Sequence, residues 1–418
     1  EILRCLVGSE MCIRDSFIIG QFEGVASTTA VSIGSQVMHM LTVMIVGLAM
    51  GTTVSIGQAI GAGDRKQAAK DVGNTVTLFM AVSIALMAVL LVLVHPIISA
   101  MSTPTEAVKG TSAYLTICFI GVPFITAYNI ISSIFRGMGD SESPMYFIAV
   151  ACAANIGLDY LFMGILRLGP AGAALGTTLS QAVSVAVSLT VILKRKKIVL
   201  KEDDFKPYRP VMGKILKIGV PIAFQDGLIQ IAFIIITIIA NQRGLNDAAA
   251  VGIVEKVIGF LFLIPSSMLS TVSALGAQNI GAGKPERAFQ TLRYAILLTV
   301  GFGMLSSIVI QFAAEPIVSL FTDRNAEGGA DVIRLGGQYL RGYIWDSIFA
   351  GIHFSFSGYF CARGKSGLSF LHNILAIALV RIPGVHLTSQ LFPETLFPMG
   401  LATAAGLLTS VVICVIAF

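Results

Sequence analysis

Charged residues are scarce in this chain. Asp, Glu, Lys and Arg make up 12% of its 418 residues, whereas soluble domains contain about 25%. The mean hydropathy is +0.84, and apolar runs such as 76–94 and 404–418 recur along the chain with hardly a charge inside them. A water-soluble globular core does not need such runs. The composition therefore excludes a soluble domain and indicates a membrane protein.

Motifs of enzymatic chemistry are also missing. The six cysteines show no spacing typical of a metal site or a disulfide framework, and the five histidines are scattered. There is no His-Glu-x-x-His zinc motif and no Gly-x-Ser-x-Gly nucleophile elbow, and the glycines before Lys365 are too far apart for a phosphate-binding loop. We therefore predict no enzymatic activity and no cofactor. His39 and His353 fall inside predicted helices, where they could relay protons or simply pack.

The apolar runs predict transmembrane helices. About 20 apolar residues cross a bilayer as a helix, and the absence of water in the bilayer forces such spans to pair their backbone internally. The sequence predicts about eleven full spans and the remnant of another before residue 26. The predicted spans are 26–56, 73–95, 110–135, 144–166, 170–193, 216–240, 248–276, 290–313, 332–358, 366–388 and 397–418.

The two halves of the chain contain the same sequence pattern. The tract Gly-Gln-Ala-Ile-Gly-Ala-Gly at 57–63 returns as Ala-Gln-Asn-Ile-Gly-Ala-Gly at 277–283, and the Pro-Ile pair at 96–97 returns at the same offset at 316–317. One two-fold duplication predicts an all-α membrane protein made of two pseudo-symmetric six-helix bundles in parallel orientation. The first bundle is expected over 15–193, a basic linker over 194–215, and the second bundle over 216–418.

The first bundle lacks most of its first helix. Because 57–63 and 277–283 should each end the second helix of a bundle, a partner for 216–240 is expected before residue 26. Residues 1–14 instead carry two cysteines and four charges. We interpret this stretch as a non-native leader; the alternative is a short amphipathic helix on the membrane surface.

Cations gather on one predicted side of the membrane. They follow both copies of the tract and fill the linker, and by the positive-inside rule these segments face the cytoplasm of a cell-membrane protein. For the linker we expect contact with anionic lipids rather than with nucleic acid. The cations nearest the two tracts are Arg65, Lys66, Lys70, Lys284, Arg287 and Arg293.

Asp159 is the clearest polar group inside a predicted span. A carboxylate there costs about 2.5 to 3.5 kcal/mol on insertion scales, so it needs a partner or a function. Asn155 lies one turn earlier on the same face, and Thr177 in the next helix could add a hydroxyl. These oxygens suit a sodium ion, and a desolvated carboxylate suits an exchangeable proton. Asp15 could complete the cluster; alternatively, the Asn155–Asp159 pair only clamps neighbouring helices.

Three further carboxylates, Asp226, Glu255 and Asp346, fall within predicted spans of the second half. Glu255 adjoins Lys256, so an interfacial position or a local ion pair is an alternative to transport. Asp346 has no adjacent cation, although Arg341 lies five residues before it. Because these positions do not repeat those of the first half, we predict that the first bundle carries the ion coupling.

Five segments occur in a characteristic order within this duplicated frame. They are Asp-Ser-Phe-Ile-Ile-Gly-Gln at 15–21, the tract at 57–63, Phe-Arg-Gly-Met-Gly-Asp at 135–140, Asn-Ile-Gly-Leu-Asp-Tyr at 155–160 and Gly-Ala-Gly-Lys-Pro-Glu-Arg-Ala at 281–288. Together they resemble the multidrug and toxic compound extrusion (MATE) family, in particular its prokaryotic branch that includes the DNA-damage-inducible F type. The resemblance runs from about residue 15 to the end, with the first helix incomplete.

The resemblance implies twelve helices in two six-helix lobes around a central cavity, and a secondary active antiporter that works by alternating access. Such a protein exports organic, often cationic, compounds in exchange for sodium ions or protons. The family's cation site in the first lobe corresponds here to Asp15, Asn155, Asp159 and Thr177, with Tyr114 a weaker match, and sodium would be held at Asn155, Asp159 and Thr177.

Two other functions remain alternatives, and the expected partners are few. A flippase for lipid-linked sugars would need a cationic cavity, for which Arg381 is the one candidate, and a passive channel is the other alternative. We expect a monomer that contacts small organic substrates and membrane lipids and does not bind nucleic acid.

Overall fold

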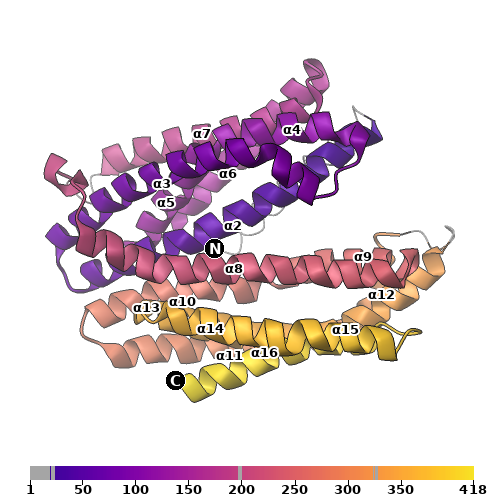
Figure 1. The fold of residues 1–418 in the computed structure, drawn as a ribbon. Helices are drawn as coiled ribbons and strands as arrows, with labels where there is room; N and C mark the ends of the chain where they lie inside the picture. Colours follow the sequence, from indigo (N-terminus) through magenta and orange to yellow (C-terminus); the bar gives the residue numbers. More distant parts are fainter. Residues whose placement is uncertain (1–18, 20–23, 196–199, 323, 325–327) are drawn as a thin grey trace. The chain divides into compact units, whose positions relative to one another are not determined.

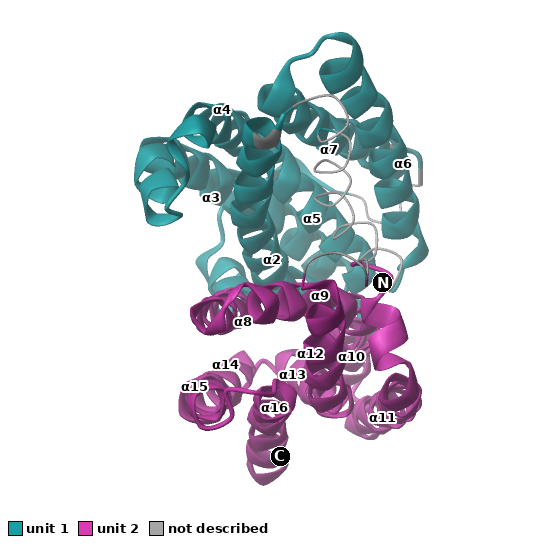
Figure 2. Ribbon diagram, turned by 90° about the vertical axis from the view of Figure 1, so that its right-hand side faces the viewer, with its two compact units in different colours: residues 1–223 teal, residues 224–418 magenta. Residues whose placement is uncertain are grey.

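The structure, a computed structural model, describes residues 19, 24–195, 200–322, 324 and 328–418 (Figure 1). Asp15 and the predicted leader lie outside these residues. Within them the secondary structure is helical throughout, without a strand. The chain forms two compact units, residues 1–223 and 224–418 (Figure 2).

The described part of the first unit contains eight helical segments in sequence and the beginning of the long helix α8. They are α2 (Val25–Gly61), α3 (Arg65–Ala100), α4 (Thr105–Ile120), α5 (Val122–Gly137), α6 (Glu142–Asp159), the π-helical η1 (Tyr160–Ile165), α7 (Gly169–Arg195), the 3-10 turn η2 (Glu202–Phe205) and the first part of α8 (Arg209–Arg243).

The second unit begins within α8 and continues to the last helix. Its further elements are α9 (Leu245–Leu261), α10 (Leu263–Gly281), α11 (Pro285–Val318), α12 (Gly329–Tyr343), α13 (Asp346–Ala362), α14 (Ser366–Ala376), the π-helical η3 (Ile377–Arg381), α15 (Ile382–Leu391) and α16 (Phe397–Ala417).

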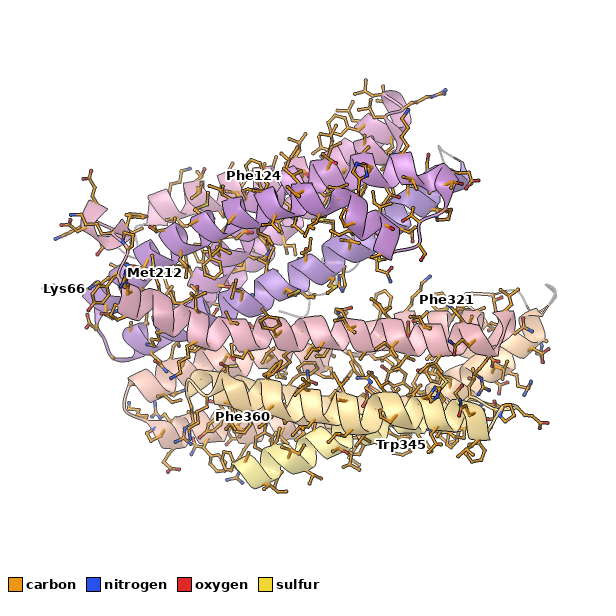
Figure 3. All side chains as sticks on the ribbon, in the orientation of Figure 1. Lys66, Phe124, Met212, Phe321, Trp345 and Phe360 are labelled. Carbon is orange, nitrogen blue, oxygen red and sulfur yellow. The ribbon has the colours of Figure 1, made fainter. Side chains whose placement is uncertain are left out.

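Nine helices in the described residues are long and apolar enough to cross a membrane, or ten if the bent pair of α4 and α5 counts as one span. The predicted all-α membrane fold is confirmed. Large apolar side chains such as Phe124 and Trp345 stay partly exposed (Figure 3). Exposed apolar surface of this kind suits helices whose outer faces meet lipid rather than water.

Two predicted helices are broken in the structure, and a third is interrupted at a single residue. The predicted span 110–135 divides at Gly121 into α4 and α5, which meet at 48°, and Pro123 in the first turn of α5 cannot donate a backbone hydrogen bond. The span 248–276 is interrupted at Phe262, yet Leu245–Gly281 still forms one span of 37 residues. The span 332–358 divides at 344–345, and its halves α12 and α13 have 15 and 17 residues, each shorter than the roughly 20 that cross a bilayer.

The repeated tract is a helix end in both halves. Residues 57–63 close α2 and residues 277–283 close α10, as predicted, and in each copy the last glycine has a left-handed backbone, with φ of 73° at Gly63 and 68° at Gly283. The N–H of each glycine donates to an isoleucine carbonyl three residues before it, at 3.0 Å. Glycine adopts this conformation without the strain that a Cβ would add.

The segment after the first bundle is docked on α3. The side-chain amide of Asn74 donates to the carbonyl of Asp204 at 3.1 Å, and the N–H of Tyr208 donates to Asn74 Oδ1 at 2.6 Å. The Lys70 ammonium lies 3.3 Å from the centroid of the Tyr208 ring. The linker, predicted from its charge to contact lipids, is thus also fixed to the first unit by specific backbone contacts.

Candidate functional site

Asp159 and Asn155 are both fully buried on α6. Each has an exposed fraction of 0%, and their spacing of four residues places them on one face of the helix. Neither Oδ1 nor Nδ2 of Asn155 has a hydrogen-bond partner among the described residues. Buried amides almost always have partners. The Asn155 amide is therefore available to bind a ligand beside the Asp159 carboxylate.

A π-helical segment follows Asp159 directly. In η1 the N–H of Leu166 donates to the carbonyl of Leu161, five residues earlier, at 2.9 Å. Such wide turns are rare in proteins overall. Where they do occur, they are often at functional sites, because they shift the register of side chains on a helix. The corresponding helix of the second half, which follows the Gly-Lys-Ser at 364–366, contains the π-helical η3, and η3 ends at Arg381.

The carboxylate of Asp159 packs directly against α7. A Cβ built on Gly176 would overlap Asp159 Oδ1, so the absence of a side chain at Gly176 makes room for the carboxylate. Thr177, the next residue, is partly buried, and its carbonyl accepts a hydrogen bond from Ser180 Oγ at 2.8 Å. The structure thus brings the first part of α7 against the end of α6 at Gly176 and Asp159.

Tyr114 lies in the same unit, on α4. It is 1% exposed and packs against α2, where a Cβ on Gly34 would overlap its ring. Tyr114 shares a hydrophobic cluster with Met163 of η1 and with Ala173 of α7. It therefore belongs to the core that supports Asp159. The fifth predicted member of the site, Asp15, lies outside the described residues.

Substitution of Gly176 tests this packing. Gly176→Ala should displace the Asp159 carboxylate and weaken ion binding about tenfold, equivalent to about 1.4 kcal/mol, without unfolding the protein. Gly157→Ala is the matched control, because a Cβ there meets nothing within 4 Å. The measurement is the sodium or proton concentration at half-maximal transport. Equal values for the two variants would contradict the proposed contact.

Asp346 in the second unit is paired with an arginine that is distant in sequence. Its Oδ2 lies 4.0 Å from Nη2 of Arg381, and the two side chains are 0% and 5% exposed. Arg381 also donates to the Tyr343 hydroxyl at 2.7 Å, and its guanidinium lies 5.1 Å from the centroid of the Phe233 ring. The sequence had offered Arg341 as the nearest cation; Arg341 instead pairs with Glu315 at 3.2 Å.

The other two carboxylates predicted in the second half differ from each other. Glu255 on α9 is partly buried and accepts a long hydrogen bond from the Thr237 hydroxyl, 3.3 Å from its nearer oxygen. Among the described residues no salt bridge joins it to the exposed Lys256, whereas Arg381 interacts with it electrostatically. Asp226 on α8 is also partly buried, and it interacts electrostatically with Cys361.

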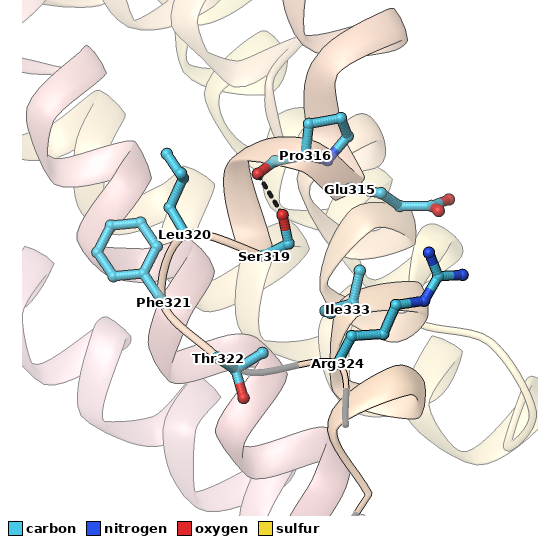
Figure 4. Close-up of a pocket in the computed structure, with 8 residues that line it drawn as sticks. All are labelled: Glu315, Pro316, Ser319, Leu320, Phe321, Thr322, Arg324 and Ile333. Atoms are coloured by element: carbon cyan, nitrogen blue, oxygen red, sulfur yellow. Dashed lines mark hydrogen bonds between the residues drawn. The ribbon is translucent and has the colours of Figure 1, made fainter. Parts of the chain in front are cut away.

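A surface pocket of about 860 Å³ lies at the end of α11 (Figure 4). Glu315, Phe321 and Arg324 line it together with Ile333 of α12. Its lining contains none of the three intramembrane carboxylates of the second unit. The pocket therefore does not form part of the candidate ion sites.

The apolar helices and the two-fold repeat define a multi-pass membrane protein. The MatE family model matches this chain twice, over residues 5–161 and 221–387, with one match in each half. The chain belongs to the MatE family. The resemblance to the MATE family that the sequence motifs indicated is thereby confirmed.

Relatives and solved structures support the same assignment. The chain is 26% identical over 393 residues to the probable multidrug resistance protein YpnP of Bacillus subtilis, covering 94% of this chain and 86% of the relative. It is 26% identical to the probable multidrug resistance protein NorM of Thermotoga maritima, covering 77% and 69%. A FAD transporter of Shewanella oneidensis is 25% identical, covering 74% and 70%.

The fold matches that of MATE transporters. A MATE transporter solved in complex with MaL6 superimposes with a TM-score of 0.91 at 20% identity, covering 100% of this chain and 92% of that one. The bent form of the Vibrio cholerae MATE transporter VcmN gives 0.88 at 21% identity, with the same coverage. These superpositions show that the chain has the MATE fold that the family resemblance implied.

Proposed function

We propose that this chain is a secondary active antiporter that exports organic, cationic compounds in exchange for sodium ions or protons. Family membership and the multidrug resistance relatives support export of small molecules. The observation that carries the ion coupling is the fully buried Asn155–Asp159 pair at the π-helical break of α6. A buried carboxylate at such a place is a functional site by default.

The Asp159 carboxylate is the group that couples ion binding to export of the organic substrate. When a proton or a sodium ion neutralises it, its desolvation cost falls, and α6 and α7 can pack differently around Gly176. For sodium, the ligands would be Asp159, the Asn155 amide oxygen and the Thr177 hydroxyl, all oxygen donors. Antiport requires only that the ion and the organic substrate favour opposite states of the carrier.

The distribution of charges predicts the membrane in which the carrier lies and its orientation there. We place the protein in the cytoplasmic membrane, with both repeated tracts and the linker on the cytoplasmic side. It functions as a monomer in contact with anionic lipids. The docked linker, with Lys70 stacked on Tyr208, lies next to the cations that follow the first tract.

Transport by the purified protein tests the proposal. Proteoliposomes are given a sodium gradient or a proton gradient separately, and the movement of an ethidium-like dye is recorded. At least one gradient should drive dye transport well above the rate in vesicles without a gradient, and the effective ion identifies the coupling. Dye movement that neither gradient accelerates would contradict antiport and favour a passive channel.

A further inference from the structure

Two buried histidines in the second unit share one hydroxyl group. His353 of α13 and His372 of α14 each have Nδ1 at 2.7 Å from Oγ of Ser410 on α16. The exposed fractions are 0%, 1% and 0%, respectively. The imidazole rings stand nearly perpendicular at 87°, with centroids 4.9 Å apart. Three helices thus meet at a single serine oxygen.

The contact extends into a string of four side chains. At its other ring nitrogen, Nε2, His372 lies 3.3 Å from the Ser357 hydroxyl, one turn beyond His353 on α13. The Nε2 of His353 is buried and has no hydrogen-bond partner among the residues that the structure describes. The string therefore runs Ser357–His372–Ser410–His353, and its last ring nitrogen is available to a further donor or acceptor.

The shared hydroxyl constrains the protons of both rings. A serine hydroxyl has one proton to donate and lone pairs to accept with. When both histidines are neutral, Ser410 can donate to one Nδ1 and accept from the Nδ1–H of the other, or it can accept from both rings while its own proton goes to the Cys414 sulfur. Proton transfer between the rings requires the first arrangement, in which they are opposite tautomers, one protonated at Nδ1 and the other at Nε2.

An added proton can enter this string through Ser357. The Ser357 hydroxyl gives its proton to Nε2 of His372, which becomes an imidazolium, and Ser357 takes a replacement proton from water. His372 then gives its Nδ1 proton to Ser410 Oγ, while the original Ser410 proton moves to Nδ1 of His353. His353 releases its Nε2 proton to water. One proton enters, one leaves, and both rings end as the other tautomer.

The charged groups around the string come from several helices. Arg381 of η3 interacts electrostatically with His353. Asp346 lies two turns before His353 on the same stripe of α13 and pairs with Arg381. Glu255 on α9 interacts with Arg381, and Asp226 on α8 with Cys361. The packed helices α10 and α16 have no charged residue, and α11 has charges only near its ends, at Glu286, Arg287, Arg293 and Glu315.

These charges couple the string to the Asp346–Arg381 pair. A positive charge on His353 is repelled by Arg381, and Arg381 pairs with Asp346, so protonation at the two places is linked through Arg381. We propose that the Ser357–His372–Ser410–His353 string is a proton-binding and proton-transfer site of the second unit. It is distinct from Asp159 and operates whichever ion couples to efflux.

Nitrogen NMR of histidine-labelled, purified protein tests the proton arrangement directly. At neutral pH the two buried histidines should give one Nδ1–H and one Nε2–H signal set, and on acidification they should titrate as a coupled pair. Ser410→Ala should uncouple the two titrations, whereas Ser410→Thr keeps a hydroxyl and should preserve the coupling. Two buried rings with the same tautomer in the unaltered protein would overturn the proposal.

Proton movement is the second measurement. Proteoliposomes containing a pH-sensitive dye should show protein-dependent proton flux without any organic substrate, and Ser410→Ala should slow it at least about tenfold. Ser355→Ala is the control, since this buried hydroxyl donates to the Gly351 carbonyl on its own helix and, in the part of the chain that the structure describes, does not contact the string. No protein-dependent proton flux, or equal flux in both alanine variants, would overturn proton transfer. Because no drug is present, these outcomes are independent of those for antiport.

Discussion

Asp159→Asn should abolish gradient-driven efflux of an ethidium-like dye while the protein stays folded. The Asp159 side chain is fully buried, and its carboxylate lies against Gly176 of α7. Asparagine keeps the size and shape of aspartate but cannot take up a proton or neutralise a sodium ion. The dye should therefore leave proteoliposomes or cells at the rate of a protein-free control, whatever gradient is applied.

The stability of this variant separates a functional loss from misfolding. Removing a charge from a buried position relieves its desolvation cost, so the thermal stability of Asp159→Asn should be equal to or above that of the unaltered protein. Asp331→Asn is the matched control, because that carboxylate is 59% exposed and its salt bridge among the described residues is with the neighbouring Arg334. The control should transport normally. Undiminished efflux by Asp159→Asn at equal expression would refute the coupling role.

Fold class was predictable because lipid imposes a simple rule on sequence. Long apolar runs must be helices, and the repeated tract fixed how they divide between two halves. The internal breaks were not predictable in the same way. Gly121 and the 344–345 junction lie inside runs that continue to satisfy the helical pattern, and their bends depend on how neighbouring helices pack. The hydropathy pattern of a single sequence contains no information on that packing.

The Asn155–Asp159 and Asp346–Arg381 pairs show the same limit of prediction from sequence. Asn155 and Asp159 could be placed together from the sequence because helical geometry joins residues four apart. Asp346 and Arg381 are on separate helices, and only the tertiary fold brings them to 4.0 Å. The one available signal was that both are charges in apolar runs of the same half, where opposite charges usually pair. The Ser410 link between His353 and His372 gave no signal of this kind.

The Asp346–Arg381 contact also bears on the flippase alternative. Arg381 was the single intramembrane cation that could hold a pyrophosphate group. Its guanidinium is 5% exposed and is engaged by Asp346 and the Tyr343 hydroxyl. An arginine whose charge is already compensated attracts an anionic substrate less strongly than a free one. The structure therefore gives the flippase hypothesis less support than the sequence did.

Arg381→Met should destabilise the protein by about 3 to 5 kcal/mol, the usual cost of removing one partner from a buried ion pair. Methionine fills much of the same space but leaves the Asp346 carboxylate without its cation and the Tyr343 hydroxyl without its donor. The measurement is thermal unfolding of the purified protein in detergent. Arg334→Met, in an exposed pair, should change stability by less than about 0.5 kcal/mol.

A second substitution distinguishes the uncompensated charge from lost packing. Asp346→Asn in the Arg381→Met background removes the buried charge and should recover most of the lost stability, because both partners of the pair are then neutral. The destabilisation of Arg381→Met alone should also shrink as the pH falls, since a proton on Asp346 removes the same charge. If neither the second substitution nor acid restores stability, Arg381 stabilises the second unit through packing with Phe233 and Tyr343 rather than through its charge.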